Sequence, residues 1–131
     1  MSGSTLACEG IRRSFDGGLV PVLRGVDLQV ASGERVAIAG RTGCGKSTLL
    51  LILALLERPD EGVLTIDGKT SSTISSPEAW RAASVGIVFQ LHHLLLHLTA
   101  AENIGLPLVG RPRVERKRRV DEMLERLRLE H

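Results

Sequence analysis

Apolar and polar residues are arranged along the chain in five stretches that predict β-strands. Apolar side chains recur at alternate positions within Val22–Val30, a spacing typical of a strand with one buried face. Arg35–Ala39 and Val85–Phe89 are instead almost continuously apolar, which predicts buried strands. An edge strand is predicted at Leu6–Phe15 and a further strand at Val63–Ile66.

Helix signals lie between and after these strands. The leucine-rich segment Ser47–Glu57 predicts a helix that stops before Pro59. Ser76, followed by Pro77, predicts an N-cap and a short helix that runs to about Ala83.

The last third of the chain predicts two more helices. Thr99 is a candidate cap for a helix over Ala100–Leu106, which Pro107 interrupts. Arg113–Leu129 predicts an amphipathic helix, whose apolar residues at helical spacing are Val120, Met123, Leu124 and Leu127. Strands and helices in this order, with 14 glycines, indicate a loop-rich α/β fold.

The segment Gly40–Ser47 matches G-x-x-x-x-G-K-[ST] at every fixed position, between a predicted strand and a predicted helix. A plain glycine-rich turn is the alternative, but the flanking elements favour a P-loop. Gly40, Gly43 and Gly45 allow the backbone N–H groups to close around phosphate oxygens. The sequence therefore predicts binding of a nucleoside triphosphate.

The residues at the end of this loop supply side-chain chemistry for the same ligand. Lys46 can reach the outer phosphates, and the Ser47 hydroxyl can ligate the Mg²⁺ that accompanies the nucleotide. Thr48 and the helix start add donors at the positive end of the helix dipole. The predicted nucleotide-binding residues of this segment are Gly40, Arg41, Thr42, Gly43, Cys44, Gly45, Lys46, Ser47 and Thr48.

Composition narrows the class of protein but names no partner. The chain has 131 residues, of which 43% are hydrophobic and 24% charged, and a net charge of +2, which is too small to indicate a polyanion. Cys8 and Cys44 lack metal-ligand spacing, which favours a reducing, cytosolic setting without a disulfide. The longest uncharged apolar run, Leu49–Leu56, is far below the ~20 residues of a membrane span, and no signal peptide is expected.

Four local patterns have competing interpretations. Arg116–Arg119 is flanked by acidic residues, which favours a solvated helix face over a nucleic-acid site. His93 and His97 have i,i+4 spacing, but the absence of a nearby carboxylate or cysteine favours a loop over a metal site. Asp67 precedes Gly68 and predicts a hairpin turn rather than a magnesium ligand. Cys44 is either a small residue that fits the loop or a reactive thiol.

Several motifs together resemble the ATP-binding subunit of ABC transporters. They are the loop GRTGCGKST, the downstream P-D-E-G and I-D-G turns, and the apolar run VGIVFQ that ends in Gln90. The stretch VGIVFQLHHLLLHLTAAENIGLPL, including the double histidine, is most similar to the lipoprotein-releasing ATPases and macrolide exporters. It departs from them at Leu96, where those relatives usually carry proline.

The resemblance implies a fold and further site residues. It implies a RecA-like P-loop core with an antiparallel β arm at residues 1–90, and a Q-loop segment with the start of a helical subdomain at residues 91–131. Phe15, otherwise a simple core anchor, would stack on adenine. Gln90 would contact Mg²⁺ and the attacking water, and would connect the core to a permease.

The resemblance also implies partners. They are ATP with Mg²⁺, an integral membrane permease whose cytoplasmic loop would meet Leu91–Leu98, and a second nucleotide-binding subunit in a homodimer. The location would be peripheral, on the cytoplasmic face of the inner membrane. No nucleic-acid partner is expected.

Only about the first half of such a domain has a match in these 131 residues. The L-S-G-G-Q signature, an Asp-Glu pair after an apolar strand and the γ-phosphate histidine are absent from the sequence. We therefore expect an ABC-type ATPase by family whose 131 residues alone bind ATP without useful turnover. The alternatives are a truncated, non-catalytic nucleotide-binding module and a soluble P-loop kinase, and the segment after Gln90 argues against the kinase.

Overall fold

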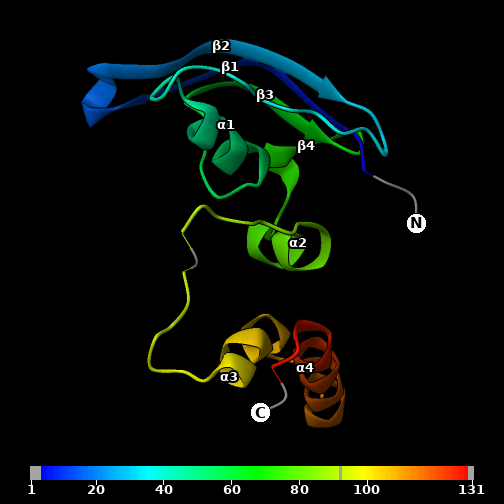
Figure 1. Cartoon of the computed structure of the whole chain (residues 1–131). Helices are drawn as coiled ribbons and strands as arrows, with labels where there is room; N and C mark the ends of the chain where they lie inside the picture. The colour runs from blue at the N-terminus through cyan, green and yellow to red at the C-terminus, as the bar shows by residue number, and fades with distance from the viewer. Residues whose placement is uncertain (1–3, 92, 130–131) are drawn as a thin grey trace. The chain divides into compact units, whose positions relative to one another are not determined.

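The computed structural model of the chain describes residues 4–91 and 93–129, which fall into two compact units, residues 1–87 and 88–131 (Figure 1). His92, the first of the two histidines in the double histidine above, lies outside the described residues. The proposed division at residue 90 into a P-loop core and the start of a helical subdomain is a functional assignment and stays a prediction.

The first unit is built on a four-stranded antiparallel sheet of order β2-β1-β3-β4. The strands are β1 (Leu6–Phe15), β2 (Val20–Val30), β3 (Glu61–Ile66) and β4 (Lys69–Thr70). The edge position predicted for Leu6–Phe15 is wrong, because β1 pairs with both β2 and β3. Its second partner, β3, begins 46 positions after β1 ends, so the local pattern of β1 could not reveal it.

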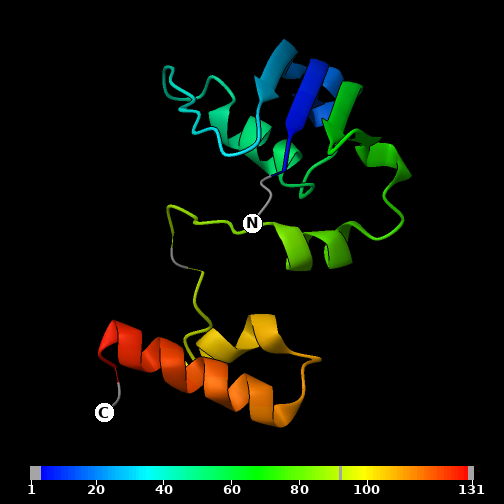
Figure 2. The same ribbon diagram turned by 90° about the vertical axis from the view of Figure 1, so that its right-hand side faces the viewer.

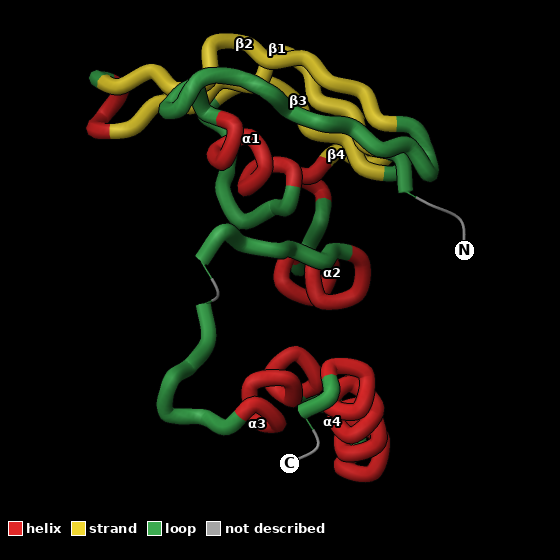
Figure 3. Tube along the Cα trace, viewed as in Figure 1, coloured by secondary structure: helices red, strands yellow, loops and turns green. Residues whose placement is uncertain are grey.

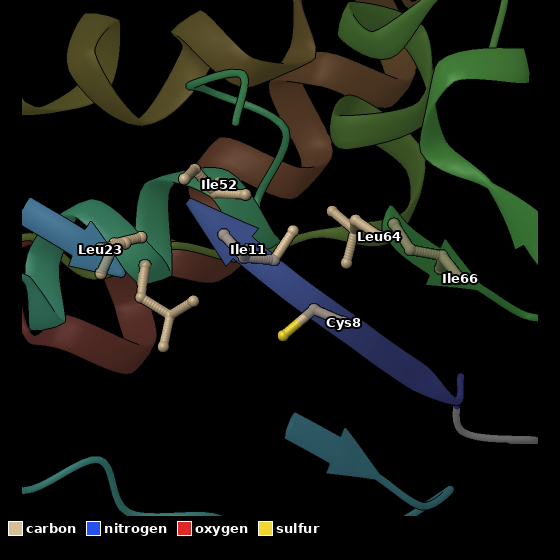
Figure 4. Packing of buried hydrophobic residues seen from close by; sticks show 7 residues of the cluster. Cys8, Ile11, Leu23, Ile52, Leu64 and Ile66 are labelled. Atoms are coloured by element: carbon tan, nitrogen blue, oxygen red, sulfur yellow. The ribbon is translucent and has the colours of Figure 1, made fainter. Parts of the chain in front are cut away.

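Helix α1 (Lys46–Leu53) packs on one face of this sheet, as Figures 1 and 2 both show. The core between them contains Cys8, Ile11, Leu23, Leu49, Ile52, Leu64 and Ile66 (Figure 4). Trp80, from α2 (Pro77–Ser84), packs against this core from its margin. Burial of aliphatic groups at about 25 cal/mol per Å² makes this cluster the main stabilising contact of the unit.

A β-bulge interrupts β1 in the middle of the sheet. Glu9 pairs with Val63 and Arg12 with Glu61, so two β1 residues, Gly10 and Ile11, face the single residue Gly62. The backbone N–H of Gly10 donates to the Asp27 carboxylate at 2.6 Å, which satisfies a donor that the bulge removes from the ladder.

Two predicted buried strands are not formed. Arg35–Ala39 and Val85–Phe89 lie outside regular secondary structure, as the loop colouring in Figure 3 shows. A strand in a parallel sheet needs a hydrogen-bonded neighbour, and neither segment pairs with another strand among the described residues. Most of their residues are exposed, Val36 to 44% and Val88 to 99%, while Ile38 and Val85 are half-buried.

The predicted helix at Ser47–Glu57 ends earlier, at Leu53, because its C-terminus closes in a Schellman motif. Leu55 has a positive φ of 57°, and the N–H of Leu56 donates to the carbonyl of Leu51 at 2.8 Å. The hairpin turn at Asp67-Gly68 is confirmed, with φ of 50° and 75° at its two residues. The Ser76 cap of α2 is confirmed as well, since its hydroxyl accepts the N–H of Ala79.

The second unit pairs α3 (Ala100–Gly105) with α4 (Arg113–Leu127), which lie side by side in Figure 2. Thr99 caps α3 in a full capping box with Glu102, and its N–H and hydroxyl hold the pKa of that carboxyl below its usual range. Within residues 4–91 and 93–129, no helix is both long enough and apolar enough to cross a bilayer.

Candidate functional site

The predicted P-loop is held in place by its contact with β2. Gly45 is the N-cap of α1 and has a φ of 95°, a conformation that favours glycine. A Cβ on Gly45 would lie 2.7 Å from Cδ2 of Leu23 and 3.1 Å from the carbonyl oxygen of Val22. The loop therefore packs so closely on the strand that this position has no room for a side chain.

Lys46 folds back over the loop that precedes it. Its Nζ donates to the carbonyl oxygens of Gly40 at 2.9 Å and Arg41 at 2.8 Å. Its Nζ also lies 3.7 Å from Sγ of Cys44. These contacts place an ammonium charge directly on the loop backbone, where a bound anion could pair with it.

The start of α1 adds donors to the same place. The N–H groups of Lys46, Ser47 and Thr48 belong to the first helical turn, which has no intrahelical acceptor for them. The helix dipole favours negative charge at this end. Ser47 is exposed, so its hydroxyl is free of packing that would keep it from an incoming ligand. The arrangement fits a phosphate group, the ligand that the sequence predicts.

A metal ion at this loop would depend on the ligand as well as on the protein. In the part of the chain that the structure describes, no group of three or more His, Cys, Asp and Glu side chains could hold a metal by itself. The Ser47 hydroxyl is the one protein ligand predicted within the loop. A Mg²⁺ ion that arrives with phosphate oxygens fits this donor set, because Mg²⁺ commonly uses few protein ligands together with substrate phosphates.

Phe15 lies at the end of β1, and the strand pairing places it near the P-loop. Its partner across the ladder is Val20, and Arg13 pairs with Leu23, the residue that contacts Gly45. Two strand residues span about 7 Å, so Phe15 lies on the order of one nucleoside length from the loop. Phe15 is 38% exposed and is therefore only a partial core anchor.

Gln90 belongs to the second unit, so its predicted role beside the P-loop stays a prediction. Its side chain is exposed. Close to it in the chain, the ring of Phe89 makes an edge contact with His93, with centroids 4.7 Å apart. His93 is exposed and lies outside any helix or strand, which agrees with its interpretation as a loop residue.

Sequence reasoning missed Asn103, which organises the loop before α3. Its amide oxygen accepts the N–H of Leu95 at 2.9 Å, and its amide nitrogen donates to the carbonyls of Leu95, Leu98 and Thr99. No sequence motif connects Asn103 to a turn that lies eight residues earlier.

Sequence reasoning also missed Arg13. The Arg13 side chain forms ion pairs with Glu57 at 2.9 Å and with Asp60 at 2.5 Å. The Arg13 guanidinium also lies 4.9 Å from the centroid of the Phe15 ring. The hydroxyl and N–H of Ser14, with Arg13, hold the pKa of Asp60 below its usual range. Two acidic residues after α1 are thus connected to the end of β1.

Comparison with known proteins identifies relatives along the whole chain. It is 44% identical to the lipoprotein-releasing system ATP-binding protein LolD 2 of Caulobacter vibrioides, covering 100% of this chain and 60% of the relative. It is 42% identical to the macrolide export ATP-binding/permease protein MacB of Rhodopseudomonas palustris, covering 98% of this chain and 21% of the relative. The chain thus spans 60% of the length of LolD 2 and 21% of the length of MacB, less than two thirds of either relative.

Comparison with solved structures also identifies an ATP-binding cassette as similar. The dimeric ATP-binding cassette MJ0796, bound to ADP and Pi, superposes with a TM-score of 0.79 at 32% identity, covering 92% of this chain and 56% of that one. The two structures therefore share the P-loop NTPase fold. The model of the ABC transporter family matches residues 23–131, which include most of β2, the P-loop segment and all later elements. The chain belongs to the ABC transporter family.

Proposed function

We propose that this chain forms the nucleotide-binding part of the ATP-binding subunit of an ABC transporter. The observation that carries the proposal is the P-loop geometry, in which Gly45 is packed against β2 and Lys46 lies over the loop backbone. The names of the relatives support ATP as the ligand, since LolD 2 and MacB are both called ATP-binding and MJ0796 is bound to ADP and Pi.

Different residues of the loop bind different parts of the triphosphate. The backbone of residues 40–45 surrounds the phosphates, Lys46 pairs with the outer ones, and Ser47 with Thr48 completes the donor set. Ser47 and Gln90 are the proposed Mg²⁺ ligands, and Mg²⁺ would neutralise charge on the phosphates. Phe15 is the proposed partner of adenine.

In the whole protein, we propose that two such subunits dimerise on a membrane permease. ATP hydrolysis would then be coupled to lipoprotein release or to export of a lipophilic substrate, from a peripheral position on the cytoplasmic face of the membrane. The similarity to LolD 2 and to MacB supports these two branches equally, at 44% and 42% identity. The exposed leucines of the segment after Gln90, such as Leu94 and Leu96, are the proposed contact with the permease.

A titration with fluorescent ATP tests the proposal. Gly45→Ala is expected to weaken ATP binding at least about tenfold, because strain at positive φ of about 1–3 kcal/mol adds to the clash with Val22 and Leu23. Gly33→Ala is the matched control, since Gly33 has a φ of 78° and no atom within 4 Å of an added Cβ. Equal affinity of the unmodified chain for ATP and for adenosine would contradict phosphate recognition by the loop.

Alkylation of Cys44 with N-ethylmaleimide is expected to abolish ATP binding. The thiol is exposed, and its Sγ lies only 2.8 Å from the place of a Cβ on Gly40, so an adduct would fill the loop. Cys8 is 1% exposed and should not react in the folded chain, and Cys44→Ser should make binding insensitive to the reagent. Labelling followed by mass spectrometry checks the site, and labelling of Cys44 at the same rate with and without ATP would argue against its place in the nucleotide site.

A further inference from the structure

The end of β1 carries a cluster in which one cation meets an aromatic ring and two carboxylates. Arg13 pairs with Glu57 and Asp60 through different nitrogens of one guanidinium, at 2.9 and 2.5 Å. The same guanidinium lies 4.9 Å from the centroid of the Phe15 ring, within the range of a cation–π contact. Arg13 therefore has its orientation fixed by two acids while it covers part of the ring.

The acids are themselves fixed. Asp60 accepts both the N–H and the hydroxyl of Ser14 through one oxygen, each at 2.7 Å, and its N–H donates to the carbonyl of Arg12. The side chain of Arg13 is 23% exposed and that of Glu57 is 32% exposed, so the pair is partly shielded from solvent. Such shielding strengthens the electrostatic contacts relative to a fully exposed pair.

The cluster lies on the strand pair that also supports the P-loop. Arg13 is opposite Leu23 in the β1–β2 ladder, and Leu23 is the side chain that leaves no room for a Cβ at Gly45. Phe15 is two residues further along β1 and remains 38% exposed. A ring with one region covered by a cation and another open to solvent is a preformed platform for a flat base.

We infer that Arg13, held by Glu57 and Asp60, is a positioning residue that fixes the ring of Phe15 for stacking on the nucleotide base. This inference rests on the proposed function, because it requires a nucleotide in the P-loop. In this proposal Arg13 makes no contact with the phosphates. The effect of Arg13 on nucleotide affinity should therefore depend on the base and should disappear when the Phe15 ring is removed.

A double-mutant cycle measures this effect. Arg13→Met removes the charge and both ion pairs but keeps an unbranched side chain. We expect it to weaken ATP binding about 3- to 10-fold, in line with the modest strength of cation–π and base-stacking contacts, while the affinity for inorganic tripolyphosphate stays within about twofold. In a Phe15→Ala background, Arg13→Met should have no further effect on ATP binding. Arg13→Lys, which keeps the charge, should restore part of the affinity.

The outcomes separate the two proposals. Equal weakening of ATP and tripolyphosphate binding by Arg13→Met, or an undiminished effect without the Phe15 ring, would overturn the inference and leave the proposed function intact. Failure of the unmodified chain to bind ATP would overturn both. If Arg13→Met does not fold, Glu57→Gln decides the matter, because it removes one ion pair and should weaken ATP binding about twofold without changing tripolyphosphate binding.

Discussion

Replacement of Gly62 by alanine is expected to lower the free energy of unfolding of the chain by about 2–5 kcal/mol, the sum of positive-φ strain and overpacking. Gly62 has a φ of 94°, and an added Cβ would lie 2.6 Å from the carbonyl oxygens of both Glu9 and Gly10. Those atoms belong to the backbone of the β1 bulge, so they cannot move aside as a flexible side chain could. The bulge would have to open, and the β1–β3 pairing with it.

Gly68→Ala is the matched control for this experiment. Gly68 has a φ of 75° in the β3–β4 turn, and an added Cβ there meets no atom within 4 Å. Only the conformational strain of about 1–2 kcal/mol should remain. Urea denaturation of the two variants and the unmodified chain gives the comparison, and equal losses for the two variants would show that close contact at the bulge does not matter.

The β1 bulge also connects stability to the candidate site. Glu61, the residue before Gly62, pairs with Arg12 across the ladder. Asp60, the next residue toward the N-terminus, accepts hydrogen bonds from Arg13 and Ser14. The close packing at Gly62 therefore sets the register that brings Asp60 to the end of β1. A change at Gly62 that left the chain folded would still be expected to disturb the Arg13 ion pairs.

Elements whose cause is local were predicted well from the sequence. The Asp67-Gly68 hairpin, the Ser76 cap and the Thr99 capping box each depend on residues within four positions of one another. The P-loop motif is also local, because it consists of eight consecutive residues. In the hairpin and the two caps the local motif determines the backbone, whereas the loop at Gly45 also packs on Val22 and Leu23 of β2.

Features that depend on distant partners were not predictable in the same way. Apolar pattern alone cannot show whether Arg35–Ala39 finds a neighbouring strand, and it does not show that β1 is internal. Arg13 contacts Glu57 and Asp60, which lie 44 and 47 positions later in the chain, so no local sequence motif predicts these contacts. The role of Phe15 in stacking on adenine follows only from the family resemblance. The contact of Arg13 with the Phe15 ring is seen only in the structure.

Lys46→Ala is expected to weaken ATP binding roughly 10- to 100-fold, since a hydrogen bond to a charged group contributes about 1.5–3 kcal/mol. The lower part of this range is the more reasonable expectation. Nζ donates to the carbonyls of Gly40 and Arg41, so a phosphate competes with those hydrogen bonds for the ammonium group. Because the side chain reaches the outer phosphates, the loss should be large for ATP and small for AMP.

Competition titrations with ATP, ADP and AMP give the required comparison. Lys69→Ala is the control, because Lys69 is exposed on the short strand β4 and the substitution changes the net charge by the same amount. A general effect of charge would weaken binding in both variants, whereas a direct contact weakens it only at Lys46 and in proportion to the number of phosphates. Equal losses for ATP and AMP would mean that Lys46 acts through the shape of the loop, by its bonds to Gly40 and Arg41, and not on the ligand.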